Sequence, residues 1–541
     1  MWPHQYLPVG GSLALSAFVA GMPIFVLLIL LGIFRKPAWM AAITGLLAAI
    51  VVASLAYRMP TQQLAGAVGY GAAFGLFPIG WVVFSAILLY NITVETGQFE
   101  IVKNSVGGLT DDRRLQALLI AFAFGAFIEG AAGFGTPVAV AAAMLTGLGF
   151  SPFYAAGICL LANTAPVAFG SIGIPLTTLA GITSLPLDRL SAGVGRICAP
   201  VSLFVPAYLV MVMGGWKALS GVLPAAALCG LAFGVTQFLV SNFVGPELTD
   251  ILASLAAMGS LVILFRVWKP KDSFALAGET RAAMVRGPIP ARALWLAWGP
   301  YILLVIFVLL WGYKPLQVKL NLLSIVFPWP GLHNLVLRLP PAMPKPMPYE
   351  AIYKFNWLSA SGTACLFAAL GSAALLRMAP RRFLRVLAST ARQLLIAEFT
   401  IAAVLALASL MNYSGATATL GLAFAATGAM FPFFSALLGW LGVFLTGSDT
   451  SANALFGNLQ VVTANRLAMN PVLMASANSA GGVMGKMISL TSIAVAAAAT
   501  AMRPGEEGRL FLFTLKHSLF LASVIGMLVL FYAYVMPAWA P

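Results

Sequence analysis

Long apolar runs, separated by short polar or proline-containing connections, occupy most of the chain and predict membrane-spanning helices. Each run has about 20 residues, and a helix of that length crosses a bilayer core of roughly 30 Å. Membrane β-strands would be shorter and would alternate in polarity, which these runs do not. The predicted spans are residues 13–34, 38–57, 74–96, 187–214, 217–241, 246–268, 293–312, 357–378, 394–411, 416–433 and 516–537.

Two further apolar regions, 115–183 and 434–502, are interrupted by residues that break helices. The interruptions are GAAGFGTP (130–137), ANTAPVAFGSIGIP (162–175), TGSDTSAN (446–453) and ASANSAGG (475–482). In a helix interior, Gly costs about 1 kcal/mol and Pro about 3 kcal/mol. Non-helical backbone at membrane depth must be buried in protein or line a wet cavity, so we expect re-entrant hairpins and broken helices. Close helix packing at small residues is the alternative for any single break.

The two interrupted regions resemble each other, which predicts an internal repeat. The matching positions are GAFIEG (125–130) with GVFLTG (442–447), Pro152 with Pro471, and Asn163 with Asn478. Chance similarity between low-complexity membrane segments is the alternative. We expect one polytopic domain, 1–541, with a first repeat at 64–241 and a second at 357–537. The predicted topology starts the two from opposite sides, so the repeat is inverted, as in many secondary transporters.

Composition supports a membrane protein. Hydrophobic residues make up 61% of the chain and charged residues only 8%, against about 25% charged residues in a typical soluble domain. The four cysteines lie within apolar runs, so we expect no disulfide. The N-terminal sequence MWPHQYLPVGG has no basic n-region, so we expect the first apolar run to be retained as a helix rather than cleaved.

The net charge of +15 would favour nucleic acid as a partner of a soluble protein, but these basic residues lie between the apolar runs. Positively charged connections tend to stay in the cytoplasm. Placing the basic clusters at 35–36, 266–292 and 377–392 inside puts the N-terminus in the periplasm. The connection 313–355, which contains RLPPAMPKPMP, then lies outside the membrane as an extended loop. Five basic residues within that connection oppose this topology. The expected partner is the lipid bilayer, with no nucleic acid.

Glu129 and Asp449 are the strongest candidates for chemistry, because each lies at a break in an apolar region. A carboxylate at the bilayer centre costs at least about 2.5–3.5 kcal/mol, so it is rarely idle. Either side chain can carry a coupling proton. The alternative is a carboxylate locked in an ion pair with Lys486 or Arg196. Either of those cations could instead bind a carboxylate of a substrate.

Polar groups around the breaks offer further contacts to a small anion. Half-helix N-termini expose backbone N–H groups, which attract anions. The candidates for substrate binding are Gly133, Gly135, Thr136, Asn163, Thr164, Ser448, Thr450, Asn478 and Ser479, with Lys486 and Arg196. A single hydroxyl more often bonds back to its own helix. Asn163 and Asn478 stand out, because an unpaired amide in hydrocarbon is costly and the two occupy matching positions.

An intramembrane enzyme and an anion channel are the two alternative classes of protein. An intramembrane enzyme would need a constellation such as HExxH or paired aspartates, and three scattered histidines do not provide one. We therefore expect no catalytic residues and no metal ligands. An anion channel is the second rival, and matched broken helices favour alternating access over a continuous pore.

The interrupted segments are similar to those of the lactate permease family of bacterial secondary transporters. The residues that carry the resemblance are FGAFIEGAAGFGTPVAVAAAML, LLANTAPVAFGSIGIP, FLTGSDTSANALFGNLQ and SANSAGGVMGKMIS, and the run of spans extends it over the whole chain. The resemblance implies proton-coupled symport of L-lactate, D-lactate or glycolate across the bacterial inner membrane. It implies a small monocarboxylate as partner and no cofactor beyond the coupling proton. Sodium coupling and a broader monocarboxylate range are the alternatives, and oligomeric state stays open.

The resemblance also implies an all-α fold with inverted repeats, hairpins and an elevator-type mobile domain. Related ion transporters carry Ser-Asn-Thr motifs that bind ions or substrate. The similar segments in this chain are Ala162-Asn163-Thr164 and Ala477-Asn478-Ser479, in which Ala replaces the first Ser. That replacement favours protons over sodium as the coupling ion.

Overall fold

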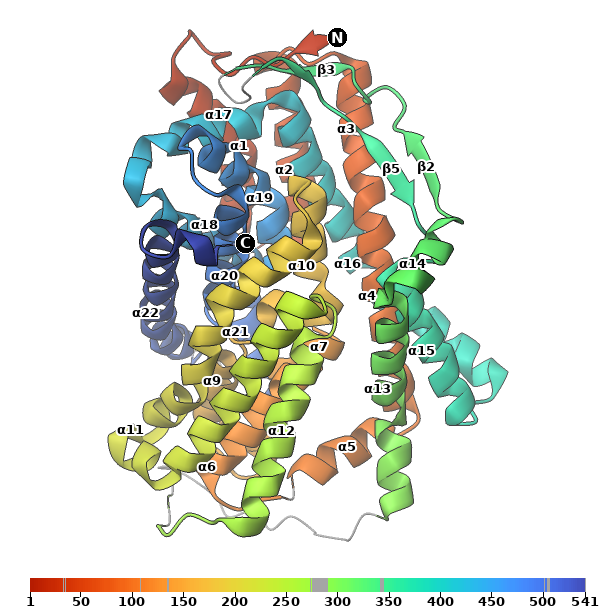
Figure 1. The fold of residues 1–541 in the computed structure, drawn as a ribbon, viewed down its shortest axis with the longest axis vertical. Helices are drawn as coiled ribbons and strands as arrows, with labels where there is room; N and C mark the ends of the chain where they lie inside the picture. Colours follow the sequence, from red (N-terminus) through yellow and green to blue (C-terminus); the bar gives the residue numbers. More distant parts are fainter. Residues whose placement is uncertain are drawn as a thin grey trace.

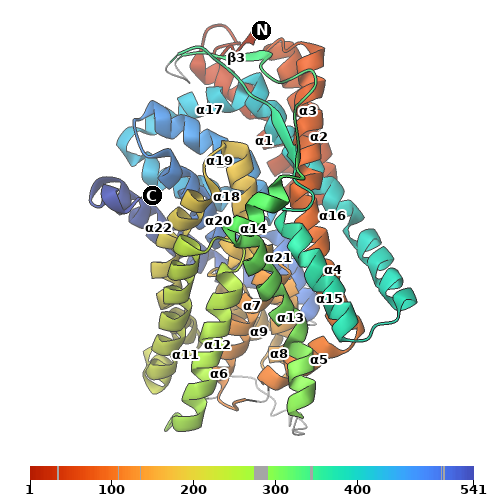
Figure 2. The same ribbon diagram turned by 45° about the vertical axis from the view of Figure 1, so that its right-hand side comes forward.

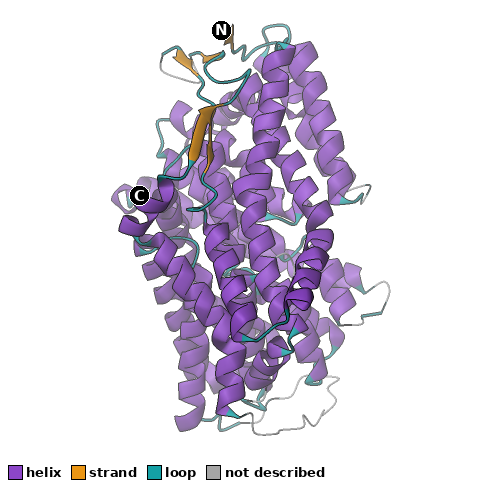
Figure 3. Ribbon diagram, turned by 90° about the vertical axis from the view of Figure 1, so that its right-hand side faces the viewer, coloured by secondary structure: helices purple, strands orange, loops and turns teal. Residues whose placement is uncertain are grey.

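The protein is a bundle of helices that carries a few short strands at one end (Figure 3). The computed structural model describes residues 1–540 except for 33, 35, 108, 134–135, 273, 275–289, 341–344, 501 and 504–505. Within this part of the chain, eleven helical stretches are long and apolar enough to cross a membrane. The predicted class, an all-α polytopic membrane protein, is therefore confirmed. The predicted basic clusters at 35–36 and 266–292 lie partly outside the described residues.

The first half of the chain supplies most of the lower part of the molecule in Figure 1. Its first helices are α1 (Leu13–Gly32), α2 (Ala38–Val51), η1 (Val52–Ala56), α3 (Thr61–Phe74), η2 (Gly75–Gly80), α4 (Trp81–Glu95) and α5 (Gln98–Gly107). The next are α6 (Arg113–Gln116), η3 (Ala117–Phe124), α7 (Gly125–Ala131), α8 (Thr136–Gly147), α9 (Pro152–Ala162), η4 (Val167–Phe169) and α10 (Gly170–Thr183). The last are α11 (Leu187–Phe243), α12 (Thr249–Val267) and α13 (Ala291–Gly312).

Much of the second half lies in the upper part of the molecule, where it packs beside α1–α3 of the first half (Figure 1). It contains α14 (Lys314–Asn321), β2 (Ile325–Pro328), β3 (Val336–Arg338), β4 (Met347–Pro348), β5 (Ile352–Phe355), α15 (Ser361–Leu375), α16 (Pro380–Ser414) and α17 (Ala416–Phe424). It ends with η5 (Ala425–Met430), α18 (Phe431–Thr446), α19 (Asp449–Arg466), α20 (Pro471–Lys486), α21 (Leu490–Ala499), α22 (Glu507–Tyr534) and η6 (Pro537–Trp539). The first part of α16 stands apart from the bundle on the right of Figure 2.

Two predicted spans are divided or extended in the structure. The span predicted at 416–433 is divided, because α17 ends at Phe424 and Gly428 adopts a positive φ of 56°. The span predicted at 394–411 and the basic segment before it form one helix of 35 residues, α16. The spans predicted at 187–214 and 217–241 agree with the structure, because they are the two parts of α11, which is interrupted at Gly214 and Gly215. A hydropathy average does not register a single residue that leaves helical geometry.

The connection 313–355 has more structure than the expected extended loop. It contains α14 and four strands, and β2 pairs antiparallel with β5 through Ile325 and Phe355. The N-terminal strand β1 (Trp2–Pro3) pairs parallel with β3, which pairs antiparallel with β4. Aromatic and β-branched residues in these short segments favour strands. The prolines in this connection predicted an extended loop, so the strand pairing was not predicted from the sequence.

Each predicted repeat, 64–241 and 357–537, contains a helical hairpin followed by a broken helix. In the first, α7 and α8 flank Gly133, and α9 continues into η4 and α10 with a bend of 65°. In the second, α18 and α19 flank Gly447, and α20 is followed by α21 after Met487–Ser489. The breaks predicted at 130–137, 162–175 and 446–453 are therefore present among the described residues. The break predicted at 475–482 is wrong, because α20 is continuous from Pro471 to Lys486 and the chain leaves helical geometry only after it.

Small residues let α18 and α20 approach closely. A Cβ on Gly481 would lie 2.0 Å from the Ala436 carbonyl oxygen, and one on Gly485 would lie 2.3 Å from that of Trp440. Such contacts bring the backbones of membrane helices together. Glycines of α20 therefore serve packing, while its polar residues face α19.

Candidate functional site

The tip of the second hairpin positions Asp449. Gly447 ends α18 in the left-handed conformation, with a φ of 73°, and a Cβ there would lie 2.2 Å from Thr491 Oγ1. Ser448 then caps α19, because its hydroxyl accepts a hydrogen bond from the Ser451 N–H at 3.2 Å. Asp449 is therefore the first residue of α19, and Thr450 follows it in the first turn.

Asp449 is buried between α19 and α20. Its Oδ2 accepts a hydrogen bond from the Ser479 hydroxyl at 2.5 Å and another from Asn453 Nδ2 at 3.2 Å. Its Oδ1 has no hydrogen-bond partner among the described residues. A Cβ on Gly482 would lie only 2.4 Å from Oδ1, so the glycine makes room for the carboxylate. One carboxylate oxygen is thus held while the other stays available.

A ladder of amides extends from this carboxylate. Asn478 Nδ2 donates to Asn453 Oδ1 at 2.9 Å, and Gln460 Nε2 donates to Asn478 Oδ1 at 3.0 Å. Asn453 Nδ2 also donates to the Pro175 carbonyl at 3.2 Å, which ties the second hairpin to α10. Asn453 and Gln460 were not among the residues predicted from sequence. Their spacing from Asp449 places all three on one side of α19, and that periodicity was the available signal.

Lys486 lies at the C-terminal end of α20 with only 9% of its surface exposed. Its ammonium donates a hydrogen bond to the Gly447 carbonyl at 2.7 Å. It lies within electrostatic range of both Glu129 and Asp449. No carboxylate oxygen of the described residues comes within 4.0 Å of its nitrogen. Lys486 therefore lies near both carboxylates without forming an ion pair with either among the described residues.

The first hairpin brings Glu129 to the same region. Glu129 is 4% exposed, and its Oε2 has no hydrogen-bond partner among the described residues. Its Oε1 lies 2.6 Å from the position that a Cβ on Gly170 would take, so α10 meets the carboxylate with bare backbone. Asn163, the residue that ends α9, adjoins Glu129 and is 3% exposed, and neither of its amide atoms is paired within the described part of the chain.

The remaining predicted residues of the first repeat have local roles or lie at its edge. Gly133 adopts a φ of 61° beside Ser171, whose hydroxyl donates to the Ala132 carbonyl at 3.1 Å. The Thr164 hydroxyl donates to the Leu161 carbonyl at 2.8 Å, which is a bond back to its own helix. Thr136 begins α8 and is partly buried. Gly135 lies outside the described residues.

Arg196 is not brought to this cluster. Its guanidinium donates to Asn242 Oδ1 at 2.8 Å and to the Trp539 carbonyl at 2.6 Å. It also stacks over the Trp539 ring, 5.3 Å from the ring centre. These contacts hold the C-terminal segment against α11, so the buried cation of the cluster is Lys486.

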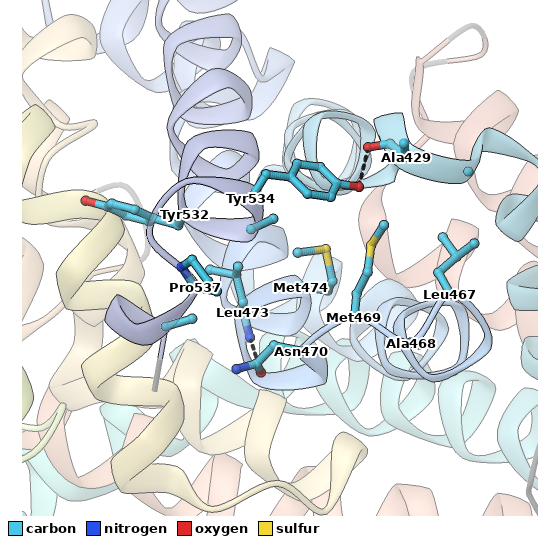
Figure 4. Close-up of a pocket in the computed structure, with 13 residues that line it drawn as sticks. Ala429, Leu467, Ala468, Met469, Asn470, Leu473, Met474, Tyr532, Tyr534 and Pro537 are labelled. Atoms are coloured by element: carbon cyan, nitrogen blue, oxygen red, sulfur yellow. Dashed lines mark hydrogen bonds between the residues drawn. The ribbon is translucent and has the colours of Figure 1, made fainter.

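A cavity of about 450 Å³ lies beside the N-terminal end of α20 (Figure 4). Its lining includes Asn470, Leu473, Met474, Tyr532 and Tyr534 but no charged side chain. The Asn470 side chain is occupied in capping α20 through the N–H groups of Val472 and Leu473. This cavity offers no cation to an anion, so the charged cluster around Lys486 is the better candidate for an anion site.

Comparison with known proteins gives a consistent match. Residues 16–536 match the family described as L-lactate permease. The glycolate permease GlcA of Escherichia coli (strain K12) is 46% identical over 99% of this chain and 98% of its own length. The L-lactate permease of Bacillus subtilis (strain 168) is 46% identical over 97% of both chains. The L-lactate permease of Escherichia coli (strain K12) is 41% identical over the full length of both.

Proposed function

Because the chain belongs to the L-lactate permease family, we propose that it is a proton-coupled symporter of L-lactate and related 2-hydroxy monocarboxylates. It is a multi-pass membrane permease and not an enzyme. The proposed location is the bacterial inner membrane with the N-terminus in the periplasm, and no cofactor beyond the coupling proton is proposed. Movement of the hairpins as one elevator-type unit is part of the same proposal.

The observation that carries the proposal is the position of Lys486 at the second hairpin tip. Its ammonium reaches the Gly447 carbonyl, directly before the N-terminal turn of α19. A helix N-terminus and a buried ammonium together attract a carboxylate. The lactate carboxylate is proposed to bind there, with the hydroxyls of Ser448 and Thr450 within reach of its 2-hydroxyl group.

Proton coupling is proposed to follow from competition for the charge of Lys486. Glu129 and Asp449, when ionised, both offset that charge from nearby. Protonating either carboxylate leaves the ammonium free to hold the substrate anion, so proton and anion bind favourably together. One anion carried with one proton makes the transport electroneutral.

The range of substrates is proposed to include glycolate. Relatives named for glycolate and for L-lactate are equally similar to this chain, at 46% identity. The two acids share the carboxylate and the 2-hydroxyl group and differ by one methyl group. Competition of labelled L-lactate uptake by glycolate, D-lactate, pyruvate and acetate would rank these substrates.

The proposal is tested by uptake of labelled L-lactate into vesicles with an imposed pH gradient. We expect accumulation inside vesicles that are alkaline inside, and no stimulation by a sodium gradient. Both Glu129→Gln and Asp449→Asn should weaken gradient-driven uptake. Uptake that a sodium gradient drives, or that is unchanged in both variants, would refute the assignment of the proton to these residues.

A further inference from the structure

A third carboxyl group, Asp250, is buried beside the cluster and was not singled out from the sequence. It is the second residue of α12 and is 1% exposed. Neither Oδ1 nor Oδ2 has a hydrogen-bond partner among the described residues. An ionised carboxylate with both oxygens unpaired in a dry interior is very costly. Such a side chain is therefore unexplained by the packing around it.

Asp250 lies against the hairpin that carries Glu129. A Cβ on Gly130, the next residue after Glu129, would lie 2.9 Å from Asp250 Cβ and 3.1 Å from the Ile251 nitrogen. The start of α12 thus meets α7 at Gly130, where an added side chain would collide with Asp250 and Ile251. Asp250 and Glu129 lie within electrostatic range of each other. Asn163, with both of its amide atoms unpaired among the described residues, adjoins Glu129.

The other groups that face Asp250 do not neutralise it. The elements packed against α12 are α7, α10, α11 and η3. Neither α10 nor η3 contains a charged residue. The titratable group that α11 brings near Asp250 is Cys198, while Arg196 is turned toward Trp539.

The buried charges are therefore unbalanced. Asp250, Glu129 and Asp449 are three carboxyl groups, and Lys486 is the one buried ammonium among the described residues near them. Ionising all three would leave two uncompensated negative charges in the interior, which the surroundings cannot stabilise. Asp449 already receives two hydrogen bonds, whereas Asp250 receives none within the described part of the chain.

We propose that Asp250 and Glu129 form a carboxyl pair that holds the transported proton, separate from the anion site at Lys486. This inference rests on the proposed proton-coupled function and says where its proton resides. Two neighbouring carboxyl groups disfavour each other's charge, so one of the two is expected to carry a proton. The unpaired amide of Asn163 supplies a donor and an acceptor for either protonation state of Glu129.

A second cavity reaches the same end of α12. It has a volume of about 260 Å³ and is lined by residues that include Glu247 and Leu248, directly before α12, and by Trp311 and Ser359 from the facing segments. It comes within one helical turn of Asp250 along the chain.

The experiment uses the full chain reconstituted in vesicles and compares Asp250→Asn with Asp188→Asn. Asp188 is the matched control, because it is also the second residue of its helix, α11, but is exposed. Two rates are measured with labelled L-lactate: exchange against unlabelled L-lactate, and net uptake driven by a pH gradient. Asp250→Asn should retain exchange and lose gradient-driven uptake by at least about tenfold, while Asp188→Asn should retain both.

The outcomes separate this inference from the proposed function. If the wild-type protein shows no uptake driven by a pH gradient, the proposed function fails. If the wild type shows it and Asp250→Asn accumulates L-lactate equally well, only the pairing of Asp250 with the proton fails. Should Asp250→Asn not fold, Asp250→Glu keeps a titratable group and is expected to transport with a displaced pH dependence. A wild-type pH dependence in Asp250→Glu would overturn the inference.

Discussion

The Lys486 ammonium and the Gly447 carbonyl oxygen form a hydrogen bond of 2.7 Å between the end of α20 and the tip of the second hairpin. The bond holds the buried ammonium in place without neutralising its charge, because a carbonyl group carries no net charge. Neighbouring carboxylates can therefore compete with an incoming anion for the same charge. That competition is the physical basis of the proposed coupling.

Removing this cation should weaken anion binding. Lys486→Met keeps the length of the side chain but loses a charge-assisted hydrogen bond worth about 1.5–3 kcal/mol, which corresponds to roughly 10–100-fold in affinity. Lys486→Arg keeps the charge and should retain part of the activity. The measurement is exchange of labelled L-lactate at several substrate concentrations. A half-saturating concentration unchanged in Lys486→Met would contradict the anion site.

Arg196 should behave differently, although it is also a cation within an apolar helix. Its contacts to Asn242 and Trp539 are structural, so Arg196→Gln should lower the melting temperature and leave the substrate affinity unchanged. A cation–π contact of this kind contributes about 0.5–1 kcal/mol at an exposed site. Thermal unfolding in detergent and L-lactate exchange would be measured on the same preparation. A large loss of affinity for L-lactate at an unchanged melting temperature would instead show that Arg196 belongs to the substrate site.

The hairpin tip should tolerate no side chain at Gly447. Its φ of 73° and the 2.2 Å that would separate an added Cβ from Thr491 Oγ1 both oppose a substitution. Gly447→Ala should cost at least about 1–2 kcal/mol of stability from the backbone conformation alone. Gly259→Ala is the control, because it lies inside α12 with no atom within 4 Å of a Cβ. Equal melting temperatures for the two variants would argue against the tip geometry.

The N-terminal segment should make stability depend on pH. Burial lowers the pKa of His4 to about 4 from an ordinary value of 6.5, and its Nε2 donates to the Tyr413 carbonyl at 2.9 Å. Between these two values the unfolded chain binds more protons than the folded one, so stability rises with pH. The contribution is complete above pH 6.5 and is lost as the pH falls toward 4, by at most about 3 kcal/mol.

The measurement is the melting temperature between pH 4 and 7 for the wild type, His4→Phe and His333→Gln. His4→Phe should flatten this dependence, because it removes the buried titratable ring. His333 belongs to the connection 313–355, and its replacement should leave the dependence in place. A wild-type slope in His4→Phe would show that the dependence has another source.

Sequence reasoning located the polar cluster because its signals are local. A carboxylate or an ammonium stands out within an apolar run, so Glu129, Asp449 and Lys486 could be predicted to act together. Asp250 was not predicted from the sequence, because an acidic residue in the first turn of a helix is usually explained by its favourable interaction with the helix dipole. Its missing hydrogen bonds become visible only once α7 is packed against it.

Other errors came from contacts between distant segments. The helices and three of the four predicted breaks follow from hydropathy and from Gly and Pro, which act within a few residues. The Gly-rich segment 475–482 is the exception, because it lies inside the continuous helix α20, where its glycines pack against α18. The position of Arg196 depends on Trp539, near the C-terminus, and the pairing of β1 with β3 joins residues more than 300 positions apart. The hydrophobic pattern of one segment does not predict its contact with a distant segment, because that contact depends on how the whole bundle packs.

The hydrogen bond from Asn453 to the Pro175 carbonyl has a consequence for leakage. It joins α19, which carries Asp449, to α10, which lies against Glu129. If one of these helices were displaced alone, this 3.2 Å bond would break and leave a buried amide unpaired. If transport is proton-coupled as proposed, this bond between α10 and α19 opposes the movement of either helix alone, and so opposes release of the proton without its anion.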